Sequence, residues 1–373
     1  MASGFDRHME RDIASRASKI DAIADSAAGR VGEPPLGTPS RWPAGRLRLR
    51  RLDAGHRPSF AEDVRQGLTS SPKVLQPRYF YDDLGSLLFA TICALPEYYL
   101  TRAEAEILHA HAGEIVASLN GPVRLVELGS GDARKTRLLI DALLARQGRL
   151  DYMPIDVSAS ALEQGSEQLL STYPNLRVTA LVADYAEGLR SIRDQEPLRA
   201  GHARNTLVLF LGSTVGNLGP EDRVGLLREV RDVLRPGDAL LLGTDLKKPE
   251  SILIPAYDDP LGVTAAFNLN VLARINRELA GGFDLRQFRH LARWNAGKSR
   301  VEMHLESRRA QTVPIRSLDL EIPFEEGETI HTENSHKFTV EQVEALAAET
   351  GFKVTRVWQD SGRRFVSSLL VAR

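Results

Sequence analysis

Between residues 123 and 243, short apolar segments alternate with longer amphipathic ones, and this alternation restricts the fold more than any other feature of the chain. The apolar segments suit strands and cover residues 123–128, 151–156, 177–183, 206–211 and 239–243. The amphipathic segments have helical spacing and cover residues 134–147, 160–171 and 220–234. Apolar strands separated by helices indicate a parallel sheet covered on both faces. We therefore predict an α/β fold in which the almost wholly apolar strand at 206–211 is central.

The segments on either side of this core predict an entry segment and a second lobe. Residues 84–95 and 102–119 have helical spacing, and Thr101 with Glu104 fits a capping box for the second of these helices. The later segments are expected to form a long, mostly helical stretch at 256–279, strands at 299–310 and 311–322, a helix at 339–350, and strands at 353–359 and 365–371. We therefore expect a helical entry segment plus core (59–250), an inserted α+β substrate-binding lobe (251–335) and a return to the core sheet (336–373).

Residues 1–58 differ from the rest of the chain. They are rich in Gly, Pro and Ser, and an arginine-rich stretch runs from 41 to 51. Acidic residues are scattered among the arginines and there is no apolar core, which opposes a secretory signal. We predict a disordered extension and assign it no function.

Composition and charge restrict the partners and the compartment. Lys and Arg number 48 against 49 Asp and Glu, and this balance does not favour a nucleic-acid binder. No apolar run approaches the ~18–20 residues that cross a bilayer, so we expect no membrane span. Cys93 is the single cysteine, which excludes an internal disulfide and a Cys-based zinc cluster. We expect a protein of the reducing cytoplasm.

The loop after the first predicted strand indicates a nucleotide-type ligand. Gly129 and Gly131 stand where this strand turns into a helix, directly after Glu127. Ligands of open α/β sheets lie outside the carboxyl ends of the strands. Asp156 ends the second strand, where a carboxylate can accept from two ribose hydroxyls, and Asp184-Tyr185 follows the third, where an adenine would fit.

The same loop argues against a dinucleotide. Arg134 occupies the region where a pyrophosphate-binding loop has its third glycine. S-adenosylmethionine has no phosphate and carries a sulfonium charge, so it suits Glu127 and Asp156 better. Arg235-Pro236-Gly237 before the fifth strand adds to this pattern. We therefore predict a class I S-adenosylmethionine-dependent methyltransferase with a Rossmann-like parallel sheet. Methyl transfer to an amine is an in-line displacement that requires no metal.

Motifs in both lobes resemble one family. They are residues 80–86 (FYDDLGS), 95–99 (LPEYY), 210–218 (FLGSTVGNL), 242–246 (LGTDL), 256–259 (AYDD) with 264–268 (TAAFN), and 332–338 (TENSHKF). Together they resemble the bacterial L-histidine Nα-methyltransferases of ergothioneine biosynthesis, from about residue 59 to the last residue. The resemblance implies three successive methylations of the α-amine of L-histidine, giving hercynine, with S-adenosyl-L-homocysteine as the second product. It also implies a monomer.

The resemblance assigns roles to individual positions. The positions that match the family's cofactor-binding residues are Gly129, Lys135, Asp156, Asp184 and Tyr185. Those that match the residues around the amino acid's amine and carboxylate are Tyr81, Tyr98, Gly212, Asn217 and Tyr257. Those that match the residues around the imidazole are Met303, Glu333 and Ser335. Of these, Tyr81 and Asn217 are expected to be catalytic.

Three other readings remain open at the level of sequence. The first is an N-methyltransferase of another aromatic amino acid such as tryptophan, against which Glu333 and Met303 argue, because they suit a small ring that carries an N–H. The second is an inactive module that binds S-adenosylmethionine and regulates a partner. The third is an NAD-dependent dehydrogenase, which Glu127 and the missing third glycine disfavour.

Overall fold

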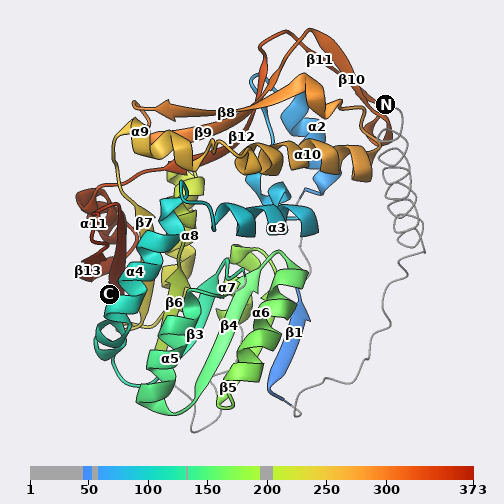
Figure 1. Cartoon of the computed structure of the whole chain (residues 1–373). Helices are drawn as coiled ribbons and strands as arrows, with labels where there is room; N and C mark the ends of the chain where they lie inside the picture. Colours follow the sequence, from blue (N-terminus) through green and yellow to red (C-terminus); the bar gives the residue numbers. More distant parts are fainter. Residues whose placement is uncertain (1–44, 53–57, 132, 194–204) are drawn as a thin grey trace, which may run out of the picture. The chain divides into compact units, whose positions relative to one another are not determined.

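A central sheet of eight strands organises the computed structural model, which describes residues 45–52, 58–131, 133–193 and 205–373. Six neighbouring strands are parallel, in the order β1 (Leu47–Arg51), β5 (Leu176–Val182), β4 (Leu150–Asp156), β3 (Val123–Leu128), β6 (Asn205–Phe210) and β7 (Ala239–Asp245). The last two run antiparallel to their neighbours and are β14 (Phe365–Ala372) and β13 (Phe352–Gln359). The predicted α/β sheet is confirmed, and its last two strands come from the C-terminal segment (Figure 1).

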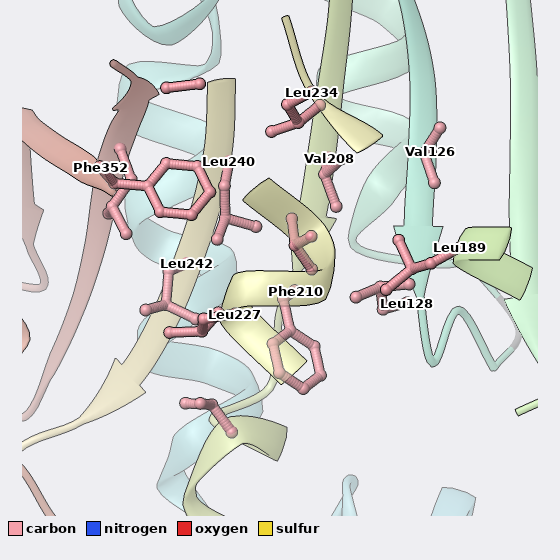
Figure 2. Close-up of a cluster of buried hydrophobic side chains, with 14 of the residues drawn as sticks. Val126, Leu128, Leu189, Val208, Phe210, Leu227, Leu234, Leu240, Leu242 and Phe352 are labelled. Atoms are coloured by element: carbon pink, nitrogen blue, oxygen red, sulfur yellow. The ribbon is translucent and has the colours of Figure 1, made fainter. Parts of the chain in front are cut away.

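Helices cover both faces of this sheet because its strands are apolar on both sides. On one face, Val208 and Phe210 of β6 join Leu240 and Leu242 of β7 in a fully buried cluster (Figure 2). The helices that contribute to this cluster are α7 (Tyr185–Arg193), α8 (Pro220–Val233) and α11 (Val340–Glu349). The alternate residue Leu209 is also fully buried. The remaining helices of the core are α4 (Tyr99–Ala117), α5 (Thr136–Gln147) and α6 (Ala159–Thr172).

Strand β1 corrects part of the prediction for residues 1–58. Residues 1–44 and 53–57 lie outside the described residues, but Leu47–Arg51 pairs in parallel with β5. The Arg46 guanidinium explains why this segment is ordered, since it donates to the carbonyl oxygens of Leu170 and Tyr173 at 3.1 and 2.5 Å. The arginine-rich composition therefore conceals an edge strand.

The second lobe is built on a four-stranded sheet. Its order is β2 (Lys73–Val74), β12 (Thr329–His336), β9 (Arg300–Ser307) and β8 (Phe288–Asn295). The predicted strand at 311–322 is instead the hairpin of β10 (Gln311–Ile315) and β11 (Leu320–Phe324). The predicted helix at 256–279 is shorter than expected. Helix α9 (Glu250–Leu253) ends before this segment, which passes through a turn at Gly262 and then forms α10 (Val263–Leu279).

The entry segment packs against this lobe, whereas the sequence grouped it with the core. It comprises α2 (Phe60–Thr69), a 3-10 turn (Pro77–Phe80) and α3 (Asp83–Ile92), and α3 lies beside α10 (Figure 1). Asp82 joins the two helices: its carboxylate accepts from Gly85 N–H, which caps α3, and from Asn270 of α10. Helix α4 begins at Tyr99, so the predicted capping box does not form, and Glu104 is fully buried. Within the described residues, no helix is long and apolar enough to span a membrane.

Candidate active site

One pocket lies between the core sheet and the lobe, and all eight predicted substrate-binding residues line it. They are Tyr81, Tyr98, Gly212, Asn217, Tyr257, Met303, Glu333 and Ser335. Their elements are far apart in the sequence, from the entry segment to β12.

The turn after β6 forms the core side of the pocket. Gly212 and Ser213 adopt positive φ values of 75° and 59° in succession, which sends the chain into a short 3-10 turn that ends at Asn217. Such a backbone costs free energy and is typical of functional sites. Two contacts hold it, because Gly212 N–H donates to the Glu104 carboxylate at 2.9 Å and Ser213 Oγ accepts from Asp245 N–H at 2.9 Å.

Strands β9 and β12 form the lobe side. Glu333 and Met303 are direct cross-strand partners, and a register shift between His331 and Glu333 marks a bulge next to them. Because strand residues alternate in direction, Glu333 and Ser335 both face the pocket. Asn217 Nδ2 donates to Glu333 Oε1 at 3.0 Å, so one hydrogen bond joins the two sides. Burial raises the pKa of Glu333 to about 8, against the opposing influence of Lys337.

Aromatic rings form the remaining wall. Tyr81 contacts Phe267 of α10 edge-on with a centroid distance of 5.7 Å, and Tyr98 contacts Tyr257 in the same way at 6.2 Å. Tyr98 therefore packs between helices and also faces the pocket. Burial raises the pKa of Tyr81 well above its usual value, so its phenol stays protonated at neutral pH.

Four of the five predicted cofactor residues lie at the carboxyl ends of β3, β4 and β5. Gly129 has φ +71°, and a Cβ atom on it would lie 2.9 Å from the Tyr185 hydroxyl, so this turn needs a glycine. Asp156 accepts backbone N–H groups from Gly131 and Ser158 at 3.0 and 2.9 Å. Asp184 Oδ1 accepts from Glu187 N–H at the start of α7. Both carboxylates lie at the edge of the sheet where ligands of open α/β folds bind.

The fifth residue, Lys135, reveals a buried acid that the sequence analysis misassigned. The Lys135 ammonium pairs with the Glu104 carboxylate, which also accepts the Gly212 N–H. Glu104 thus connects a predicted cofactor residue to a pocket residue. Sequence spacing placed it in a helix cap, and only its contacts across the fold identify it. Glu127 likewise faces protein groups, because it accepts from Thr136 and Tyr152 and its pKa rises through burial to about 7.

The comparisons with known proteins agree with this geometry. The profile of the family described as "Histidine-specific methyltransferase, SAM-dependent" matches residues 60–372. A histidine N-alpha-methyltransferase of Mycolicibacterium smegmatis is 47% identical over 313 residues, which are 84% of this chain and 95% of the relative. One from Mycobacterium tuberculosis is 46% identical over 317 residues, 85% of this chain and 96% of the relative. The ergothioneine biosynthesis protein 1 of Neurospora crassa is 34% identical over 205 residues, 55% of this chain and 23% of that protein.

The chain belongs to this family. The predicted fold, the enzyme class and the S-adenosylmethionine cofactor are therefore confirmed. Membership also excludes the dehydrogenase reading of the glycine loop. Among the described residues, no group of three or more His, Cys, Asp or Glu side chains is placed to hold a metal.

Proposed function

We propose that the chain transfers three methyl groups in succession from S-adenosylmethionine to the α-amine of L-histidine, giving hercynine for ergothioneine biosynthesis. One observation carries the proposal: the hydrogen bond between Asn217 and Glu333 at 3.0 Å. It brings a carboxylate suited to a ring N–H next to an amide suited to an amine, in a chain of the histidine-specific family. The relatives named for histidine N-alpha-methylation favour histidine over tryptophan.

The lobe side of the pocket would recognise the imidazole. Glu333 would accept an N–H of the ring, and the Ser335 hydroxyl would serve the other ring nitrogen. Met303, opposite Glu333 and 2% exposed, limits the width of this part of the pocket. A site built around a buried hydrogen bond rejects ligands that lack the donor, so this set favours a small ring that carries an N–H.

The core side would hold the amine and the carboxylate. One N–H of the Asn217 amide is used by Glu333, which leaves its second N–H for the carboxylate and its Oδ1 for an amine N–H. The Tyr98 and Tyr257 hydroxyls would donate to the carboxylate without adding charge. The neutral Tyr81 phenol would accept a second amine N–H. The nitrogen lone pair is then free to point at the donor.

Bound S-adenosylmethionine would supply a methyl group activated by its sulfonium. Asp156 would bind the ribose hydroxyls, while Asp184 and Tyr185 would bind the adenine, with Gly129 and Lys135 completing the site. Orienting two reactants in this way recovers up to ~7–11 kcal/mol of a barrier, so positioning is the main contribution of these side chains.

Replacement of Glu333 tests the assignment. In Glu333→Ala, the kcat/KM for histidine should fall about 30- to 1,000-fold, because a buried hydrogen bond is lost and a ring N–H is left unpaired. Glu333→Ala combined with Met303→Val should also admit a larger ring. The measurement is competition between histidine and tryptophan, with mono-, di- and trimethylated products separated by mass.

Asn334→Ala is the matched control, because Asn334 is the next residue of β12 and points away from Glu333. It should retain the wild-type preference. If the double variant also retained that preference, Glu333 would not recognise the side chain. If the wild-type protein left histidine unmodified, the function itself would be wrong.

We further propose a monomeric enzyme of the cytoplasm that binds neither nucleic acid nor membranes. The monomer is what the resemblance to the histidine Nα-methyltransferases implies. Cys93 is the single cysteine of the chain, which suits a reducing compartment, and the balanced charge gives no electrostatic preference for a polyanion. Size-exclusion chromatography with light scattering tests the monomer.

A further inference from the structure

A buried cluster of charges lies behind the pocket and has no part in the function proposed above. The Asp245 cluster consists of Asp245, Lys248, Lys337 and Tyr99. Asp245 Oδ2 is 2.8 Å from Lys337 Nζ and Asp245 Oδ1 is 2.5 Å from Lys248 Nζ. Tyr99 donates to Asp245 Oδ2 at 2.8 Å. The side chains of Asp245 and Lys337 are completely buried.

The backbone places Lys337 against the pocket wall. Residues 333, 335 and 337 share one face because side chains alternate along the strand, and Lys337 directly follows β12. Backbone bonds hold this position, since Lys337 N–H donates to the Ser299 carbonyl and Phe338 N–H donates to the Asp245 carbonyl. Lys337 Nζ then reaches the Tyr257 hydroxyl at 2.7 Å and Ser335 Oγ at 2.9 Å.

The cluster carries more positive than negative charge. Two lysines share the single carboxylate of Asp245. Burial alone would lower the pKa of Lys337, but Asp245 and Tyr257 outweigh it and the pKa lies above its usual value. Lys337 is therefore an ammonium at neutral pH, and a buried ammonium of this kind favours an anion nearby.

The hydrogen bonds of the two hydroxyls leave one donor for the pocket. Lys337 has no acceptor capacity, so Tyr257 and Ser335 each accept from it. The two hydroxyls are 2.7 Å apart, and one of them donates to the other. The hydroxyl hydrogen that is not used between Tyr257 and Ser335 has no acceptor among Tyr257, Ser335 and Lys337. Both residues line the pocket, so this hydrogen is available to a ligand there.

We infer that Lys337 is a positioning residue that makes the Tyr257–Ser335 pair a hydrogen-bond donor toward the carboxylate of the amino-acid substrate. This inference rests on the proposed function and adds the origin of the selectivity for a carboxylate. Without Lys337 the two hydroxyls can accept as well as donate toward the pocket. With Lys337 the pair keeps one hydroxyl hydrogen that it can donate toward the pocket, and a positive charge stands behind the pair.

The reach of the charge is sufficient for a measurable effect. A carboxylate bound to the Tyr257 hydroxyl would lie about 5 Å from Lys337 Nζ, two hydrogen-bond lengths away. At that separation two opposite charges in a protein attract strongly enough to change an affinity by at least about tenfold. The effect belongs to substrate binding, so it should appear mainly in KM.

The test compares L-histidine with histamine, which has the same ring and amine but no carboxylate. The measured quantity is the ratio of kcat/KM for histidine to kcat/KM for histamine. In Lys337→Met, this ratio should fall at least about tenfold relative to the wild type, because only histidine loses an interaction. Calorimetric binding of S-adenosylhomocysteine, whose proposed site lies elsewhere, shows whether the variant is folded.

Two further variants separate the contact from the general charge. Lys337→Gln keeps N–H donors without the charge, so the histidine-to-histamine ratio should fall less in this variant than in Lys337→Met. If Lys337→Met does not fold, a fall of the ratio in Lys337→Gln is the test of the inference. Lys248→Met removes a lysine from the same cluster but leaves Tyr257 and Ser335 untouched, and its ratio should stay within about threefold of the wild type.

Three outcomes would overturn the inference. They are a ratio unchanged in both Lys337 variants, equal losses for histidine and histamine, and a Lys248→Met effect as large as that of Lys337→Met. A wild-type protein that does not methylate histidine would instead refute the proposed function, whatever the variants do.

Discussion

Glu333 binds its proton very differently in the folded and the unfolded chain. Burial raises its pKa from the ordinary 4.5 to about 8 in the folded protein. Between these values the folded state holds a proton that the unfolded state has released. Stability therefore decreases as the pH rises through this interval, by at most ~1.4 kcal/mol per pH unit, and the decrease ends above about pH 8.

Glu333→Gln should therefore be more stable than the wild type, by an amount that grows from about pH 5 to about pH 8 and then stays constant. Urea unfolding at several pH values measures the difference. Glu341→Gln is the control of opposite sign, because hydrogen bonds from its own backbone N–H and from Thr339 lower the pKa of Glu341. Its effect on stability should become more unfavourable as the pH rises above that lowered pKa. A constant difference for Glu333→Gln would show that the carboxyl is ionised in the folded protein.

Glu104 should matter for both substrates. Glu104→Ala removes the partner of Lys135 and the acceptor of Gly212 N–H, and should destabilise the fold by about 2–3 kcal/mol, since Lys135 is partly exposed and water softens the loss. It should also raise KM for histidine and for S-adenosylmethionine together. Glu106→Ala, two residues along α4, removes one exposed hydrogen bond from Ser361 N–H and should cost less than about 1 kcal/mol. A change in only one KM would contradict the bridging position of Glu104.

At the scale of elements, Asp82 joins the entry segment to the lobe. Asp82→Ala removes the cap of α3 and the bond to Asn270, and should cost about 1–2 kcal/mol. Because Tyr81 precedes this cap, KM for histidine should rise while binding of S-adenosylhomocysteine changes little. Arg277→Ala removes the ion pair between Arg277 and Asp82, whose atoms are 2.5 Å apart, but leaves the cap of α3. Because Arg277 is half exposed, this variant should cost less than about 1 kcal/mol. Equal effects in the two variants would assign the stability to the ion pair.

The sheet could be predicted from sequence because each strand carries its own signal. The apolar run at 206–211 and the glycine loop after 128 are local features, and the corresponding strands are confirmed within one or two residues. Helix α7 and strand β8 were not predicted from the sequence. Helix α7 begins at Tyr185, directly after Asp184, and the sequence analysis assigned both residues to ligand binding. Strand β8 lacks a clear apolar pattern because many of its residues are only partly buried. Strand β1 was missed because exposed arginines conceal its two leucines.

The pocket residues were predictable through motifs, whereas their contacts were not. The family motifs contain Asn217 and Glu333, but their hydrogen bond depends on how the lobe folds back over the core, across 116 positions of sequence. Lys337 lies inside a motif, but only the folded chain places its ammonium against Tyr257. Sequence patterns do not show which residues that are far apart in the chain come into contact in the fold.

At the scale of the whole molecule, the N-terminal residues divide into two parts. Every pocket residue lies after residue 80, so deleting residues 1–44 should leave histidine methylation within a few-fold of the full chain. Deleting residues 1–52 also removes β1 and the carbonyl contacts of Arg46, and should lower the urea midpoint. Assays and urea unfolding of both truncated chains measure this. A loss of activity in the shorter deletion, with the fold intact, would give residues 1–44 a role at the site.

The cross-strand pairing of Met303 with Glu333 has a consequence for how these two positions can change during evolution. The two side chains lie opposite each other on neighbouring strands of one sheet, and both line the pocket. A lineage that moves to a different ring cannot change either one alone without leaving a void or an unmatched carboxylate. The two positions should therefore be inherited as a pair and substituted together, while the carboxyl ends of β3, β4 and β5 stay as they are.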